Sequence, residues 1–264
     1  MMNRAEKSRE LFNQLFGKET FAENEADPDF YEIMNRFIYG DIFHHGSLSN
    51  DIRELITLVV LTVNHTVPQL KEHVSAAIKT GVTPAKIKEA VYHCAPYIGF
   101  PKTLDALEEI NKAFKSLGID LPVQSQVQTE ETDRFDKGLD VQVKIFGDVI
   151  AQMHKSAPAN QRHIQEYLSA FCFGDFYTRS GLDLKTRELL TLCIVTALGG
   201  ADSQVKSHVQ GNIHTGNDKE TLIAAITHCL PYIGFPRTLN ALACLNEVIP
   251  EKQRKEGNDD ENSR

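Results

Sequence analysis

A strong helical pattern of hydrophobic residues lies between positions 52 and 63. Apolar side chains recur there three and four residues apart, at Ile52, Leu55, Ile56, Val59, Val60 and Val63. Leu58 and Leu61 extend the apolar surface almost all the way round, so this segment is predicted to be a central, buried helix. The stretch from Leu189 to Leu198 shows the same pattern and predicts a second central helix.

The segments that follow the first central helix carry start and stop signals of further helices. PQLKEHVSAAIKTG begins with Pro68 and stops at Gly81, and the next helix has Thr83 as its N-cap and Pro84 at its first position. Pro96 is expected to kink or end that helix. A final helix is then expected after Gly99 and Pro101, with apolar positions at Leu104, Leu107, Ile110 and Phe114. The pattern therefore predicts an all-α fold.

The chain contains the same unit twice. HCAPYIGFPKTLDAL, from His93, and HCLPYIGFPRTLNAL, from His228, differ at only three positions, and similar parallels cover about 120 residues in each half. We predict repeat one at residues 1–118, a polar linker at 119–132, repeat two at 133–250 and a disordered tail at 251–264. The two repeats are expected to be related by a pseudo-twofold axis. On structural grounds alone, the repeated phrase is a joint between two helices.

Composition narrows the classes of partner. The 264 residues carry a formal net charge of −8, which argues against nucleic acid as a main partner because phosphate binding needs a clustered basic surface. No apolar stretch approaches the roughly 20 residues that span a bilayer, and the N-terminus does not have the pattern of a secretory signal. Five cysteines without paired spacing do not predict a disulfide framework. We expect a soluble, cytoplasmic protein that acts on a small molecule.

Four polar residues recur on or beside the predicted apolar faces and could carry chemistry. They are Glu54 and His73 in repeat one, and Glu188 and His208 in repeat two. A carboxylate beside a partly buried imidazole is the minimum equipment for proton transfer, so each pair is a candidate catalytic site. The alternatives are structural: each glutamate follows an arginine at a helix start and could serve an ion pair or the helix dipole, and each histidine could be a hydrogen-bonded core residue.

Other repeated residues give weaker signals. Cys94 and Cys229 follow His93 and His228, but neighbours on a helix point about 100° apart, so a reactive thiol would need a partner from another helix. No repeated spacing of His, Cys or Asp forms a closed ligand set, so no metal and no cofactor are predicted.

These motifs resemble the carboxymuconolactone decarboxylase family, part of the all-helical superfamily that includes alkylhydroperoxidase D. The resemblance covers nearly the whole chain, once in each half, and rests on DRFDKGLDVQVKIFGD, FGDFYTRSGLDLKTRELLTL, the HV of LKEHV and VKSHV, GVTPAKIKEAVYHCAPYIGFP and PRTLNAL. Single-copy decarboxylases of this kind form hexamers, so the resemblance implies a homo-oligomer, with three two-repeat chains forming a six-unit ring.

The resemblance also bears on the chemistry. The peroxidase branch uses a CxxC pair before the histidine, and this chain has Thr66 and Gln69, or Ala201 and Gln204, at those positions. The decarboxylase branch lacks CxxC too and keeps the histidine. The decarboxylase branch commonly has Trp-Gly-Glu at one position of each repeat. This chain has Tyr-Gly-Asp there in repeat one, ending at Asp41, and Phe-Gly-Asp in repeat two, ending at Asp175. The decarboxylase branch often has no glutamate at the positions of Glu54 and Glu188.

Three functions therefore stay open. The first is a cofactor-free lyase that decarboxylates a small carboxylated lactone or keto acid by Glu/His proton transfer. The second is a thiol-dependent peroxidase that uses Cys94 or Cys229, and the third is a non-enzymatic ligand-binding or assembly protein. For the lyase, we expect Asp41, Asp175, Tyr97 and Tyr232 to bind substrate, Phe100 and Phe235 to add walls, and each histidine to reach its glutamate directly or through one water. Repeat two, which is closer to the family at Leu182–Arg187, is expected to hold the working site.

Overall fold

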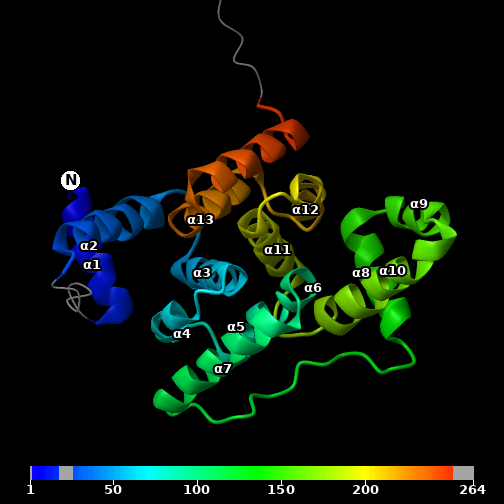
Figure 1. The fold of residues 1–264 in the computed structure, drawn as a ribbon, viewed down its shortest axis with the longest axis horizontal. Coiled ribbons are helices and arrows are strands. Elements are labelled where there is room, and N and C mark those ends of the chain that lie inside the picture. The colour runs from blue at the N-terminus through cyan, green and yellow to red at the C-terminus, as the bar shows by residue number, and fades with distance from the viewer. Residues whose placement is uncertain (1, 18–25, 252–264) are drawn as a thin grey trace, which may run out of the picture.

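The computed structural model describes residues 2–17 and 26–251, and these residues form helices joined by loops, without any β-strand (Figure 1). The all-α prediction is confirmed. The helices of the first half are α1 (Arg4–Phe16), α2 (Pro28–Asn35), η1 (Arg36–Asp41), η2 (Ile42–His44), α3 (Asn50–Asn64), η3 (Val67–Gln69), α4 (Leu70–Lys79), α5 (Pro84–Tyr92), α6 (Ala95–Ile98) and α7 (Phe100–Ser116). Those of the second half are α8 (Arg134–Phe146), α9 (Val149–Ser156), η4 (Ala159–Gln161), α10 (Arg162–Tyr167), η5 (Leu168–Tyr177), α11 (Leu184–Leu198), α12 (Asp202–His214) and α13 (Lys219–Val248).

The two predicted central helices, α3 and α11, pack against each other in the middle of the body (Figure 1). Every residue from Arg53 to Val63 in α3, and from Arg187 to Ala197 in α11, is buried. Side chains of both halves form one continuous hydrophobic core around these helices. The nearly all-round apolar pattern therefore reflects burial inside a core that the two repeats share.

The other local predictions are largely confirmed. The Thr83 hydroxyl accepts a hydrogen bond from the Lys86 amide and caps α5. Gly99, at φ 81°, and Gly234, at φ 77°, stand at equivalent breaks before the last helical stretch of each repeat. The expected break near Pro96 is present: α5 ends at Tyr92, and Pro96 lies in the first turn of the short helix α6, where a proline leaves no needed amide unsatisfied.

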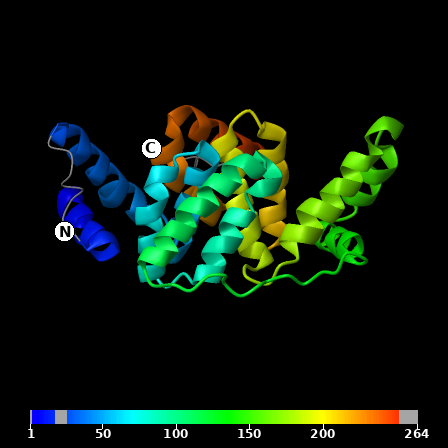
Figure 2. The same ribbon diagram turned by 60° about the horizontal axis from the view of Figure 1, so that its bottom comes forward.

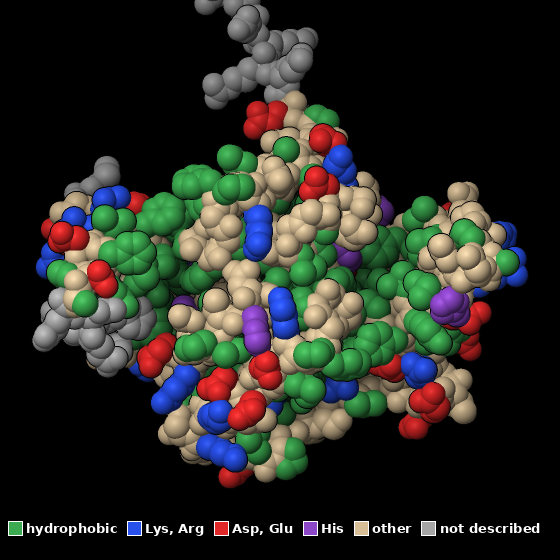
Figure 3. Space-filling view, viewed as in Figure 1, with side chains coloured by type: hydrophobic (Ala, Val, Ile, Leu, Met, Phe, Trp, Pro, Cys, Tyr) green, Lys and Arg blue, Asp and Glu red, His purple; other side chains and the backbone are tan. Residues whose placement is uncertain are grey.

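Each half also extends an arm away from the body (Figure 2). The arm of repeat one contains α1 and α2, and that of repeat two contains α8, α9 and α10. Gly40 lets η1 approach α1, since a Cβ there would lie 2.3 Å from the Arg4 carbonyl oxygen, and Gly174 makes the same approach to Arg134 at 2.2 Å. Hydrophobic side chains gather where the arms meet the body (Figure 3).

The segments η1 and η5 are π-helices. The sequence predicts a helix here but not this winding, in which each hydrogen bond spans one residue more than in an α-helix. π-Helical turns are rare and often occur at functional sites. The two segments carry Tyr39 and Tyr177 into the interior.

Inter-repeat contacts are reciprocal. Arg53 of α3 approaches His228 of repeat two, and the equivalent Arg187 of α11 approaches His93 of repeat one. Reciprocal pairing of equivalent residues is the signature of twofold relation, in agreement with the predicted pseudo-twofold axis.

The linker between the repeats is extended and runs along one side of the body (Figure 2). Its polar side chains are interrupted by Ile119, Leu121 and Val123, which pack against the core. Further along, the Gln126 carbonyl accepts a hydrogen bond from the Ser180 amide, so the linker is attached to both repeats. The predicted disordered tail lies outside the described residues except for its start, and within them no helix is long and apolar enough to cross a membrane.

Candidate active site

Each repeat brings one glutamate and one histidine into direct contact. In repeat one, His73 Nδ1 of α4 lies 2.8 Å from Glu54 Oε2 of α3. In repeat two, His208 Nδ1 of α12 lies 2.9 Å from Glu188 Oε2 of α11. Both glutamates are fully buried, and the histidines are 6% and 7% exposed. The predicted Glu/His contact is confirmed in both repeats, while its catalytic role stays a prediction.

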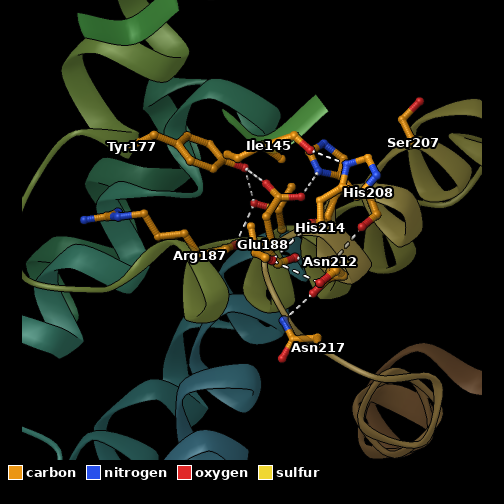
Figure 4. Close-up of polar contacts among 12 residues, drawn as sticks. Ile145, Tyr177, Arg187, Glu188, Ser207, His208, Asn212, His214 and Asn217 are labelled. Carbon is orange, nitrogen blue, oxygen red and sulfur yellow. Dashed lines mark hydrogen bonds and ion pairs between the residues drawn. The ribbon is translucent and has the colours of Figure 1, made fainter. Parts of the chain in front are cut away.

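In repeat two, both carboxylate oxygens of Glu188 are hydrogen-bonded (Figure 4). The Tyr177 hydroxyl donates to Glu188 Oε1 at 2.7 Å, opposite the bond to His208. The same hydroxyl lies 2.8 Å from Thr191 Oγ1 and 3.0 Å from Tyr97 Oη. These contacts fix the carboxylate in one position.

This arrangement also fixes which nitrogen of His208 faces the glutamate and which one is left to meet other groups. An ionised carboxylate only accepts hydrogen bonds, so His208 Nδ1 must carry the hydrogen that it directs at Glu188. The other ring nitrogen, Nε2, then presents its lone pair away from the glutamate. A carboxylate that orients an imidazole in this way also stabilises the imidazolium that forms when Nε2 takes up a proton.

Asn212 ties the two helices of this site together. Its side-chain amide donates to the main-chain carbonyls of Glu188, at 2.9 Å, and of His208, at 2.7 Å (Figure 4). Asn217 donates in turn to the Asn212 side-chain oxygen at 2.7 Å. The relative position of α11 and α12 is therefore held by polar contacts at the functional pair itself.

Aromatic rings enclose each histidine, and one of them comes from the other repeat. His208 packs edge-on against Phe146 of its own repeat and against Tyr97 of repeat one, with ring centroids 5.5 and 6.1 Å apart. His73 likewise packs against Phe16 and against Tyr232 of repeat two. The two tyrosines proposed to bind substrate thus lie at the Glu/His pairs, but each serves the pair of the opposite repeat.

Phe100 and Phe235 lie elsewhere. They are 56% and 61% exposed, and Phe100 packs against Phe171 at 5.7 Å between ring centroids. Their place on the surface does not support the expectation that they wall the site.

The repeated histidines of the HC phrases also cross between repeats. Arg187 Nη1 lies 3.4 Å from His93 Nδ1, and His93 Nε2 lies 2.8 Å from Thr191 Oγ1. Because a guanidinium only donates, His93 Nδ1 must accept and Nε2 must carry the hydrogen. Burial, helped by the positive charge of Arg187, holds the pKa of His93 well below its usual value. His93 is therefore a neutral residue that positions Thr191.

The two candidate thiols are core residues. Cys94 and Cys229 are 0% exposed, and their sulfurs lie 3.5 and 3.2 Å from the carbonyl oxygens of Ala90 and Ala225, four residues earlier in the chain. Burial raises the pKa of the Cys94 thiol far above its usual value. Because a thiol reacts as the accessible thiolate, this geometry argues against the peroxidase hypothesis.

The candidate substrate-binding aspartates are engaged elsewhere. Asp41 forms an ion pair with Arg4 at 3.2 Å, and Asp175 forms one with Arg134 at 2.8 Å. These pairs fasten η1 to α1 and η5 to α8, which gives the aspartates a structural role, and their contact with substrate stays a prediction. The equivalence of the two pairs explains why both aspartates recur.

Sequence reasoning missed Tyr177 and the threonines. Tyr177 has no tyrosine at the equivalent position of repeat one, which is Phe43, so a search for repeated polar residues could not find it. Thr57 and Thr191 do recur, three residues after the glutamates, and that spacing was a usable signal. In the part of the chain that the structure describes, no three His, Cys, Asp or Glu residues are grouped as metal ligands.

Comparisons with known proteins agree with this architecture. The model of the carboxymuconolactone decarboxylase family matches the chain twice, at residues 28–112 and 162–247, once within each repeat. The 4-carboxymuconolactone decarboxylase of Acinetobacter baylyi is 32% identical over 96 residues, which are 36% of this chain and 72% of that protein. The nitrosuccinic acid decarboxylase of Metarhizium robertsii is 27% identical over 130 residues, 48% of this chain and 90% of that protein.

Proposed function

The chain belongs to the carboxymuconolactone decarboxylase family, and we propose that it is a cofactor-free carboxy-lyase whose repeat-two site acts on a small carboxylated lactone, keto acid or comparably activated acid. The observation that carries the proposal is the Glu188–His208 pair, with Tyr177 completing the carboxylate's hydrogen bonds. A decarboxylase-type function agrees with both named relatives, which are decarboxylases of different acids.

The proposed reaction has two steps. The C–C bond to the carboxylate breaks, CO₂ leaves, and the electron pair moves into the neighbouring carbonyl, lactone or nitro group. The carbon takes up a proton that comes from solvent through His208: Nε2 accepts it to form the imidazolium and then gives it to the carbon, which leaves His208 neutral again. One proton is thus consumed for each CO₂ released. Glu188 stabilises the imidazolium, and the rings of Phe146 and Tyr97 restrict water around the reacting carbon.

His208→Ala tests this proposal. Removing the proton donor should lower kcat/KM by about 10²–10⁴-fold, measured as CO₂ release from 4-carboxymuconolactone and from nitrosuccinic acid. His163→Ala, on the exposed face of α10, is the matched control and should keep full activity. Wild-type turnover of either acid that is unchanged in His208→Ala would refute the assignment.

We also propose that the protein self-associates as a trimer of two-repeat chains. Large hydrophobic side chains are exposed at equivalent positions of the two repeats, Phe100 and Leu104 in α7 and Phe235 and Leu239 in α13, each more than half exposed. Exposed apolar patches of this kind favour an interface. Light scattering after size exclusion should give three times the chain mass, and a stable monomer at micromolar concentration would contradict the proposal.

A further inference from the structure

A cavity of about 170 Å³ lies beneath the linker, outside the Glu/His sites. It is bounded by α5 on one side and by linker residues 123–126 on the other, with Arg179 beside them. The charged side chains that line it are Lys88, Glu89 and Arg179.

The charges around this cavity do not balance. Arg179 binds both oxygens of Glu89, at 2.9 and 3.0 Å, and Arg187 binds the same carboxylate at 3.0 Å. Lys88, only 5% exposed, has the neutral side chain of Asn111 as its hydrogen-bond partner. Two arginines therefore share one carboxylate, and Lys88 has no acidic partner among the described residues.

One further acid interacts with this group of charges. Asp175 feels the charge of Arg179, but its carboxylate forms an ion pair with Arg134. Burial lowers the pKa of Lys88 and of Arg187, which shows that their positive charges are poorly solvated. A buried excess of positive charge is costly unless an anion accompanies it.

The duplication shows that the fold does not need this cluster. At the equivalent positions of the other half, Ile223 stands for Lys88, Ala224 for Glu89 and His45 for Arg179. The equivalent helical segment of α13 is formed without these charges, and Ala224 is buried there. A cluster that only one copy carries, next to a cavity, is suited to binding.

We propose that the cavity beneath the linker binds a small oxyanion, a carboxylate or phosphate group, between Arg179 and Lys88. The volume suits a molecule of a few non-hydrogen atoms. The Arg179 guanidinium packs over the ring of Tyr92, with the guanidinium carbon 5.4 Å from the ring centroid. The amides and hydroxyls of Gln124, Ser125 and Gln126 supply neutral donors on the linker side.

Isothermal titration of the full chain with inorganic phosphate, and separately with succinate, tests the proposal. At least one probe should give saturable binding at constant ionic strength, and the comparison of the two identifies the preferred group. Arg179→Gln and Lys88→Met should each weaken binding about tenfold or more, as expected for loss of a charge-assisted contact. Lys102→Gln, which removes a cation remote from the cavity, should bind as the wild type does.

Because Arg179 and Lys88 are partly structural, a second variant leaves every charge in place. Ala85 lines the cavity at the start of α5, and Ala85→Leu should fill it and abolish binding while the thermal melting temperature without ligand stays near that of the wild type. Absence of saturable binding for both probes, or equal binding by wild type, Ala85→Leu and Arg179→Gln, would overturn the proposal. None of these measurements depends on decarboxylase activity.

Discussion

The two Glu/His pairs share their geometry but differ in what completes them. In repeat two, the Tyr177 hydroxyl contacts Glu188, Thr191 and Tyr97 at 2.7, 2.8 and 3.0 Å. In repeat one, the equivalent residue is Phe43, and the buried Glu54 Oε1 has no hydrogen-bond partner among the described residues. Buried acceptors without a partner are uncommon and costly, which marks the repeat-one site as the altered copy.

The equivalent arginines Arg187 and Arg53 also have different partners, and again the polar network of repeat two is the more complete one. Arg187 is buried against the carboxylate of Glu89. Arg53 is equally buried but is held by the main-chain carbonyls of Leu48 and His45, and burial lowers its pKa to about 10. The Glu/His pair, and a buried histidine beside an arginine of the central helix, occur in both repeats, whereas the full polar network around the glutamate occurs only in repeat two. This difference is why we assign the chemistry to Glu188 and His208.

The largest expected effect on stability comes from Glu89→Ala. It would leave Arg187 and Arg179 buried without their carboxylate, and breaking a buried ion pair from one side costs about 3–5 kcal/mol. Urea unfolding measures the change. Glu108→Ala, which removes one partner of an exposed pair with Lys112, should cost at most about 1 kcal/mol. A similarly small loss of stability for Glu89→Ala would show that main-chain carbonyls alone stabilise Arg187, as they do Arg53. The carboxylate would then not distinguish repeat two from repeat one.

A smaller effect should be common to both repeats. Burial, with the charge of Arg53, lowers the pKa of His228 from 6.5 to about 3, and His93 is shifted in the same direction. The folded protein keeps these rings neutral, while the unfolded chain takes up protons below pH 6.5. The free energy of unfolding therefore falls as the pH drops below 6.5, by about 2–3 kcal/mol at pH 4.5 for His228, and His93 adds a decrease in the same direction.

Urea unfolding between pH 4.5 and 7.5 tests this expectation. His93→Gln and His228→Gln should each reduce the pH dependence by a similar amount, and the exposed His163→Gln should leave it unchanged. If either His93→Gln or His228→Gln alone removed the whole pH dependence of stability, the two histidines would not be equivalent in the two repeats.

The smallest expected change in stability comes from exchanging the residues at positions 177 and 43, and it tests the difference between the two Glu/His sites most directly. Tyr177→Phe removes a donor from Glu188 and should destabilise the protein by about 1–3 kcal/mol, because Glu188 Oε1 would be left without a partner. The reverse exchange, Phe43→Tyr, should place a hydroxyl near Glu54, Thr57 and Tyr232 and stabilise the protein by about 1 kcal/mol. Both are read from urea unfolding. A destabilising Phe43→Tyr would show that the repeat-one site has no room for the hydroxyl and is differently shaped.

Local features of the chain were predictable because they depend on neighbouring residues. The period of apolar positions identified α3 and α11, and Thr83 and Gly99 marked the ends of helices. The repeated glutamate and histidine also identified the pairs, since both residues lie on the inner faces of consecutive helices. The π-helical winding of η1 and η5, and their close approach to α1 and α8 at Gly40 and Gly174, were not predicted, because the hydrophobic pattern does not distinguish a π-helix from an α-helix.

By itself, the sequence determined two copies of a helical unit, a buried central helix in each, and a glutamate and histidine able to meet. Only the tertiary structure decided that the HCxPYIGFP phrases serve the opposite repeat, with His93 and Tyr97 completing the site of Glu188. It also decided that Tyr177 belongs to that site and that Cys94 is inert. The reason is physical: helical periodicity and capping depend on residues a few positions apart, whereas the contacts of His93 and Tyr97 with repeat two join side chains 80–98 positions apart, where α6 packs against α11.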